Sequence, residues 1–349
     1  MKLLIMLIFY FILMLSTLIT LSSHSWMIIW MMLEINLMSF IPIIMLSKMI
    51  NNHTFLFKYF IVQTISSSSF LITITLMWIN DYSLNIFNTN FMEIMLSLSM
   101  ILKMGLYPFH LWYIEIMLNL PWMMFFLMST WQKIIPLTII SFFNENTIIY
   151  MTIIISSMIS SIQGIYQNNL RKIFAFSSIN QTSWLTINSN MSIYLMIMYM
   201  LMYMMILFSI INMLNVNNFY YINNLYLLNN YHYLMKLFLF LNILSLAGLP
   251  PFMGFITKII SIKFLIFNKM YLITSILIIS SLMTLFFYLR LTYTSMILIK
   301  SKFNPLMMKK YSKDFSYKSY FFNKLNFMMI MITILSYFSL IIMTLFDLY

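Results

Sequence analysis

Three lysines interrupt long apolar stretches of this chain. Lys103, Lys133 and Lys258 lie in LSLSMILKMGLYPFHLW, MSTWQKIIPLTII and LSLAGLPPFMGFITKIISI. A charged side chain near the centre of a bilayer costs about 2.5 to 3.5 kcal/mol on insertion scales, so ionisable residues at that depth are candidates for function. Because an amine can take up and release a proton, the three lysines predict movement of protons or cations across a membrane.

The composition places the chain in a membrane. Hydrophobic residues make up 62% of its 349 residues, charged residues only 7%, and the mean hydropathy is +0.93. A soluble domain of this size could not bury so much apolar surface, so we expect a polytopic protein with a single transmembrane domain over residues 1–349. Met, Phe and Tyr are abundant, as A- and T-rich codons would supply, and Met and Phe stripes are therefore interpreted as genome bias.

Eleven apolar segments predict membrane crossings, since about 20 residues of helix span the hydrocarbon core. We expect an all-α fold with crossings near residues 3–21, 26–46, 57–79, 91–118, 122–143, 147–166, 171–188, 192–214, 235–267, 271–298 and 326–346. The segments 91–118 and 235–267 are too long for one crossing, and they contain the breaks GLYP and GLPP. Two of the helices should therefore be discontinuous.

The two breaks should bring water close to lysine side chains. Proline removes a backbone donor and leaves carbonyl groups unsatisfied, which is tolerated at membrane depth only where the backbone faces protein or water. Transporters use such discontinuous helices to build ion sites near the midplane. Lys103 precedes its break and Lys258 follows its break, so both are expected to contact water inside the protein.

The distribution of basic residues predicts the topology. With residue 1 on one side and eleven alternating crossings, the other side receives Lys269 as its only loop lysine or arginine, together with Asp81, Glu145 and Asp347. The first side, which should be the cytoplasm or the mitochondrial matrix, receives Lys2, Lys48, Lys58, Arg171, Lys172, Lys236, Lys300, Lys302, Lys309, Lys310, Lys313, Lys318 and Lys324. A basic loop over residues 299–325 accounts for much of this charge and favours lipid headgroups over nucleic acid.

Other charges lie within or beside the predicted crossings. Glu34 is near the middle of its apolar segment, where it cannot easily reach water. Lys263, Arg290 and Glu93 can extend to an interface, and we interpret them as snorkelling side chains. Glu115, in the second half of a broken helix, fits either a buried site or a surface position.

Several kinds of chemistry find no support in the sequence. The chain has no cysteine, and His24, His53, His110 and His232 are scattered without metal-ligand spacing. There is no GxGxxG or GxxxxGK[ST] segment for a nucleotide. We therefore expect no metal or cofactor in this chain, and any electron chemistry should occur on a partner.

Four strings, LKMGLYPFHLW, STWQKIIP, RKIFAFSSINQTSWL and LSLAGLPPFMGFITK, occur in an order and spacing that resembles the subunit 2 family of mitochondrial NADH:ubiquinone oxidoreductase, respiratory complex I. The resemblance covers essentially the whole chain. It implies an antiporter-like, proton-translocating subunit in the mitochondrial inner membrane, with its N-terminus on the matrix side and other membrane-arm subunits beside it. NADH, FMN, iron-sulfur clusters and ubiquinone would then be bound by partner subunits.

The same resemblance assigns a proton relay to Glu34, Lys103, Lys133 and Lys258, which occupy the charged positions of the family's motifs. One departure is visible, because the family's SSIxHxGW reads SSINQTSW here. The usual His and Gly are thus missing, although a polar path can still be lined by Ser177, Ser178, Asn180 and Gln181.

The expected mechanism rests on how surroundings change proton affinity. Burial favours the neutral form of an amine, whereas a nearby carboxylate favours the charged form. At roughly 10 Å and an effective dielectric constant of about 20, a carboxylate and an ammonium attract by about 1.7 kcal/mol. A change in the separation or hydration of Glu34 and Lys103 would therefore switch Lys103 between holding and releasing its proton, with Lys133 relaying toward Lys258.

Two other functions share these features. A self-sufficient cation/proton antiporter would have the same broken helices and lysines but would transport ions without partner subunits. A purely structural membrane anchor would use its buried charges only to pair and to hold helices in place, so that neutralising the lysines would disturb assembly alone.

Overall fold

A computed structural model describes residues 2–47, 54–82, 89–143, 147–217, 219–225, 233–250 and 252–297, and these are helical almost throughout. The predicted basic loop 299–325 and the predicted crossing 326–346 lie outside the described residues. The helices are α1 (Lys2–Ser22), α2 (Trp26–Leu46), α3 (Thr54–Tyr82), α4 (Thr89–Met104), α5 (Leu111–Asn119), α6 (Trp122–Ser129), η1 (Trp131–Lys133), α7 (Ile134–Ile140), α8 (Thr147–Ile165), α9 (Leu170–Met191), α10 (Ile193–Asn217), α11 (Tyr233–Ala247), α12 (Met253–Phe267) and α13 (Tyr271–Ile297).

The predicted all-α, multi-pass architecture is confirmed over the described residues. Seven helical spans there are long and apolar enough to cross a membrane, with Trp122–Ile140 counted as one span. The two discontinuous crossings appear as the pairs α4 with α5 and α11 with α12. Helix α9 has 22 residues, or about 33 Å at 1.5 Å per residue, which also suffices for a crossing although its side chains are more polar.

A third helix is interrupted, which the sequence analysis did not anticipate. The predicted crossing 122–143 divides into α6, the 3₁₀ turn η1 and α7, with Thr130 at φ −120° and ψ −73° between the first two. Pro136 supplies the physical reason, because a proline ring clashes with the carbonyl four residues earlier in a regular α-helix. The hydroxyl of Thr130 donates to Phe126 O at 2.6 Å, which further ties the end of α6.

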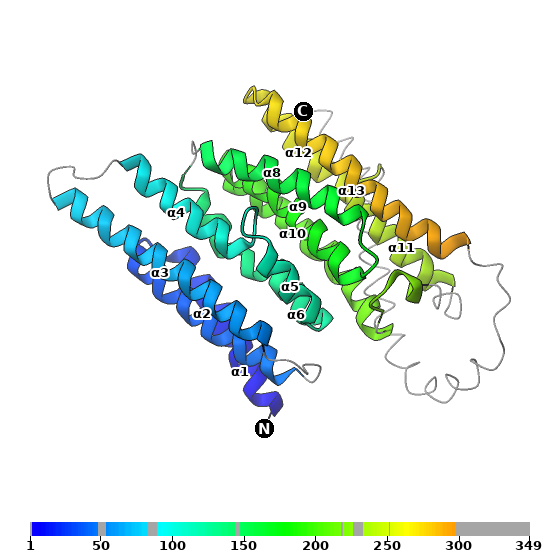
Figure 1. Cartoon of the computed structure of the whole chain (residues 1–349), viewed down its shortest axis with the longest axis horizontal. Helices are drawn as coiled ribbons and strands as arrows, with labels where there is room; N and C mark the ends of the chain where they lie inside the picture. Colours follow the sequence, from blue (N-terminus) through cyan, green and yellow to red (C-terminus); the bar gives the residue numbers. More distant parts are fainter. Residues whose placement is uncertain are drawn as a thin grey trace.

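The helices lie side by side, and the chain progresses across the bundle from α1–α3 on one side to α11–α13 on the other (Figure 1). Helix α9 lies between them and packs against α5, α7, α8, α10, α12 and α13. Every residue of α9 from Ile173 to Asn190 is buried. A polar helix is thus placed where protein, rather than lipid, surrounds it.

The outer helices present apolar side chains to the surroundings. On α1, Leu4, Leu7, Phe11 and Leu18 recur at helical spacing and are each more than half exposed. Helices α3 and α13 do the same with Ile61, Ile65, Ile72, Leu272, Leu282 and Phe286. Such faces suit lipid tails or the apolar surface of a neighbouring membrane subunit.

Candidate functional site

Lys103 lies in the last turn of α4, directly before the first break. The chain turns there through Gly105 at φ +68°, and a Cβ at this position would come within 2.6 Å of the Cβ of Tyr113. Glycine therefore allows both the left-handed backbone and the close return of α5. The carbonyl of Lys103, freed by the break, accepts a hydrogen bond from Gln63 Nε2 at 3.4 Å.

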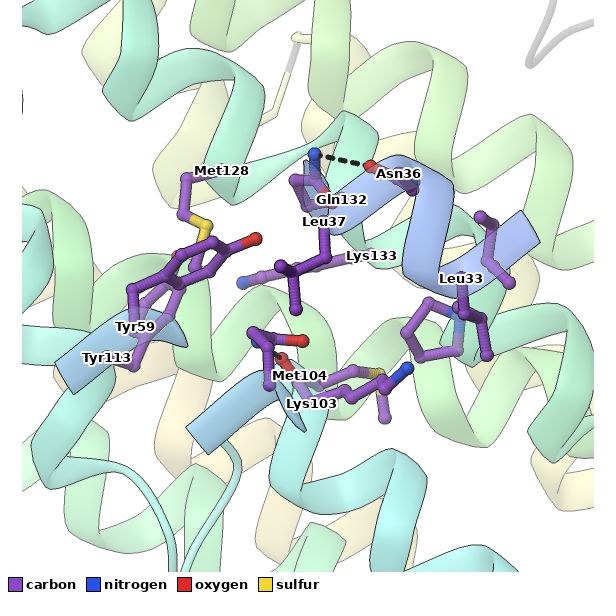
Figure 2. A pocket seen from close by; sticks show the side chains of 13 residues that line it. Leu33, Asn36, Leu37, Tyr59, Lys103, Met104, Tyr113, Met128, Gln132 and Lys133 are labelled. Carbon is purple, nitrogen blue, oxygen red and sulfur yellow. Dashed lines mark hydrogen bonds between the residues drawn. The ribbon is translucent and has the colours of Figure 1, made fainter. Parts of the chain in front are cut away.

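Lys103 and Lys133 line the same cavity. It has a volume of about 20 Å³ and is lined by Leu33, Asn36, Leu37, Tyr59, Gln63, Lys103, Met104, Tyr113, Met128, Gln132, Lys133, Ile135 and Pro136 (Figure 2). This volume is enough for about one water, and the polar lining offers it several partners. The break after α4 and the interruption after α6 thus bring two amines to one small polar space.

Lys133 is held at the cavity by the interrupted helix. Its side chain is only 2% exposed, and its amine lies 4.6 Å from the ring centroid of Tyr113. Figure 2 shows this amine pointing toward Tyr113, whereas the amine of Lys103 points to the opposite side. Lys133 Nζ also donates to Ser178 O on α9 at 3.4 Å. The tyrosine face and the carbonyl stabilise its charged form without an ion pair.

Glu34 reaches the same region from α2. It is partly buried, and its carboxylate accepts a hydrogen bond from the Ser67 hydroxyl on α3. It interacts electrostatically with Lys103. Within the described part of the chain the two do not form a direct ion pair, and the only ion pair within 4.0 Å joins Lys58 and Glu115. Glu34 is therefore close enough to Lys103 to affect it electrostatically without direct contact.

Lys258 occupies a second, separate site. Its amine donates to Ala247 O at 2.9 Å, so the lysine caps the carbonyl that ends α11. Gly248 has φ +82°, and a Cβ there would lie 2.9 Å from Lys258 Nζ. A cavity of about 10 Å³ adjoins the lysine and is lined by Gln181, Tyr199, Met202, Tyr203, Ile206, Ser245, Leu246, Gly254, Thr257 and Lys258.

Helix α9 lies between the two sites. Ser178 contacts Lys133, and Gln181, one turn later, lines the cavity of Lys258. Gln181 accepts a hydrogen bond from the Tyr199 hydroxyl at 2.5 Å. The structure thus places Lys103 and Lys133 at one cavity and Lys258 at another, with α9 beside both. Glu34 lies near Lys103 but does not line the cavity.

Glu115, whose position the sequence left open, and Arg290, which we interpreted as a snorkelling side chain, both lie outside the two lysine sites. Glu115 pairs with Lys58 at 2.5 Å on the surface, where their side chains are 52% and 57% exposed. Arg290 donates to Ile165 O at 2.6 Å and to Gln167 O at 2.5 Å, and so caps the end of α8. Among the residues that the structure describes, no group of three His, Asp or Glu could hold a metal ion.

Several polar groups that line the two cavities were not predicted from the sequence. Asn36, Gln63 and Gln132 are amides within apolar crossings, and Gln132 donates to Asn36 Oδ1 at 2.9 Å. Their position within apolar segments could have predicted such a contact from the sequence, because a buried amide needs a hydrogen-bond partner. Tyr113, Tyr199 and Tyr203 carried no such signal, since 23 tyrosines occur along the chain.

Comparisons with known proteins agree on one family. The family model described as NADH:quinone oxidoreductase/Mrp antiporter, transmembrane, matches residues 23–284. The NADH-ubiquinone oxidoreductase chain 2 of Anopheles gambiae is 37% identical over 319 residues, which cover 90% of this chain and 93% of that protein. The protein of the same name from Locusta migratoria is 31% identical over 304 residues, covering 86% and 88%.

Solved structures share the fold at low sequence identity. A chain of respiratory complex I from Thermus thermophilus with bound aureothin has a TM-score of 0.78 at 16% identity, covering 95% of this chain and 78% of that chain. A chain of the Mrp complex from Dietzia has a TM-score of 0.71 at 15% identity, covering 83% and 60%. These likenesses show an antiporter-like arrangement of helices.

The contact between Gly248 and Lys258 predicts a coupled loss of stability. Gly248→Ala should destabilise the protein by about 1 to 2 kcal/mol through the left-handed backbone, with a further loss because the methyl group displaces the amine from Ala247 O. The measurement is thermal unfolding of the assembled protein for Gly248→Ala, Lys258→Ala and the double variant. The stability lost in the double variant should be at least about 0.5 kcal/mol smaller than the sum of the losses in the two single variants. If the two losses simply added, the contact between Gly248 and Lys258 would be contradicted.

Proposed function

The chain belongs to the NADH-ubiquinone oxidoreductase chain 2 family, within the NADH:quinone oxidoreductase/Mrp antiporter group, and we propose that it translocates protons in the membrane arm of such an oxidoreductase. The resemblance carried by its four motifs is thereby confirmed as a family relationship. It is a multi-pass membrane protein that acts in association with other subunits of an oxidoreductase complex.

The shared cavity of Lys103 and Lys133 is the observation that carries the proposal. Two buried amines beside one water-sized polar space can exchange a proton through that space, because water both accepts and donates. Neither amine has a carboxylate within 4.0 Å among the described residues, so neither charge is fixed by an ion pair. If the two lysines served only to hold helices in place, we would expect a carboxylate in direct contact with each, because a buried charge without a partner is costly.

The proton path begins at Glu34. When the carboxylate lies near Lys103 it stabilises the ammonium form, and when it withdraws or becomes hydrated Lys103 releases a proton into the cavity. Lys133 receives this proton and passes it toward Lys258. Lys258 can hold a proton because Ala247 O accepts from its amine, and it exchanges with the far compartment.

The energy for this cycle comes from outside the chain. NADH, FMN, iron-sulfur clusters and ubiquinone belong to partner subunits, and this chain contributes no complete active site. The proposal places the chain in the mitochondrial inner membrane with its N-terminus on the matrix side. The one-sided distribution of basic loop residues and the chain 2 relatives of insects support that placement.

Lys133→Arg tests whether the proton or only the charge matters. Arginine keeps the charge but does not lose its proton in proteins, whereas Lys133→Met removes the charge. Both variants should slow proton transfer through this chain by about 100-fold or more, since removal of a positioned acid-base group typically costs that much. The measurement is the proton-to-electron ratio of the assembled complex in proteoliposomes.

Lys58→Met serves as the control for this series, because Lys58 is exposed and lies outside the cavities. It should leave the ratio unchanged. If Lys133→Arg pumped like the unmodified complex, the lysine would be a structural charge and the relay would be wrong. If the isolated chain alone exchanged cations for protons in liposomes, the self-sufficient antiporter would replace the proposed function.

Glu34→Gln should uncouple the complex partially. Glutamine still accepts from the Ser67 hydroxyl, so the helix contact remains while the negative charge near Lys103 is lost. An attraction of about 1.7 kcal/mol at roughly 10 Å corresponds to roughly a 10- to 20-fold change in proton exchange at Lys103. Coupled proton transfer, measured as above, should slow by that factor. Glu115→Gln is the same substitution at an exposed ion pair, and an equal effect there would refute the role of Glu34.

A further inference from the structure

Four buried tyrosines lie near one another inside the bundle. Tyr113 on α5, Tyr199 and Tyr203 on α10, and Tyr288 on α13 are each at most 4% exposed. Tyr203 lies near the other three. Three helices therefore bring phenolic hydroxyls into one region of the bundle, and simple apolar packing would not need those hydroxyls.

These tyrosines connect one cavity to the other. Tyr113 lines the cavity of Lys103 and Lys133, and its hydroxyl lies 2.7 Å from Ser178 Oγ. Tyr199 and Tyr203 line the cavity of Lys258. Tyr203 therefore lines the second cavity and also lies near Tyr113, which lines the first.

The hydroxyl of Tyr203 makes no well-directed hydrogen bond to a described residue. In the part of the chain that the structure describes, neither Tyr203 Oη nor Tyr288 Oη makes a well-directed hydrogen bond, although both are buried and have a serine hydroxyl nearby, Ser129 and Ser177 respectively. Ser129 lies beside Tyr203, but its hydroxyl donates to Phe126 O at 3.0 Å and does not form a well-directed bond to the phenol. A buried hydroxyl without a partner is costly and calls for a functional reason or a bound water.

The hydroxyl of Tyr199, by contrast, has a hydrogen-bond partner. Its hydroxyl donates to Gln181 Oε1 at 2.5 Å, and Gln181 Nε2 donates to Leu246 O at 3.4 Å. An amide does not take up protons near neutral pH, so Gln181 orients the wall of the cavity without carrying charge. The free hydroxyl of Tyr203 is then the group able to accept from one side and donate to the other.

We propose that Tyr203 carries protons between the Lys133 cavity and the Lys258 cavity, through a hydroxyl path that begins at Tyr113 and Ser178. This inference rests on the proposed proton translocation. In net, Lys133 loses one proton and Lys258 gains one. Each hydroxyl on the path accepts a proton on a lone pair, releases its own proton on the far side and rotates back, with no oxidant or reductant involved.

Tyr203→Phe in the assembled complex tests the proposal. Proton pumping and NADH:quinone turnover are measured in proteoliposomes in H₂O and in D₂O, and thermal unfolding is recorded in parallel. We expect coupled proton transfer to fall about tenfold or more, the solvent isotope effect to change, and the unfolding temperature not to fall. Phenylalanine removes a buried hydroxyl that makes no well-directed bond to a described residue, so the variant should be at least as stable as the unmodified protein.

Two further variants separate the possible outcomes. Tyr194→Phe, at an exposed tyrosine on the same helix, should change nothing. Lys133→Met reports on the relay as a whole. If Lys133→Met blocks pumping while Tyr203→Phe pumps normally with an unchanged isotope effect, the Tyr203 proposal fails and the proposed function stands. If neither variant affects pumping, the proposed function itself fails. Failure of Tyr203→Phe to assemble would also count against the proposal, since it would reveal a structural role.

Discussion

The need to satisfy backbone groups inside a membrane governs this structure. A helix that breaks at membrane depth exposes carbonyls, and each must find a donor within the protein. Ala247 O accepts a hydrogen bond from Lys258, and Lys103 O accepts one from Gln63. At the second break, helix end and lysine therefore depend on each other, because the freed carbonyl makes a buried amine tolerable and the amine makes the break tolerable. At the first break an amide has the second of these roles.

Helix α9 extends this principle to the whole bundle. Its serine, threonine, asparagine and glutamine side chains could not face lipid without cost, and helices on several sides enclose them. Most of its hydroxyls donate to carbonyls of their own helix, as Ser178 does to Ala175 O at 2.8 Å. The same helix forms part of both lysine sites, so a single polar element separates and connects them.

The crossings and the two glycine-proline breaks could be predicted because hydropathy and backbone chemistry are local properties. The interruption over residues 130–133 was missed, since Pro136 lies within an otherwise continuous apolar run and its ring clashes with the carbonyl of Gln132, four residues earlier, in the 3₁₀ turn. Glu115 could equally have been buried, and the structure pairs it with Lys58 on the surface. The tyrosines of the two sites could not be predicted, because 23 tyrosines occur along the chain and the residue type alone does not single out any of them.

The sequence alone determined the membrane class, the approximate crossings and the lysines that deserve a functional explanation. These follow from transfer energies that depend on each segment by itself. Only the tertiary structure decided that Lys103 and Lys133 share a cavity, that Lys258 has its own, and that Tyr203 of the second cavity lies near Tyr113 of the first. Helical periodicity tells which side chains share a face of one helix, whereas the choice of neighbour depends on packing among helices distant in the chain.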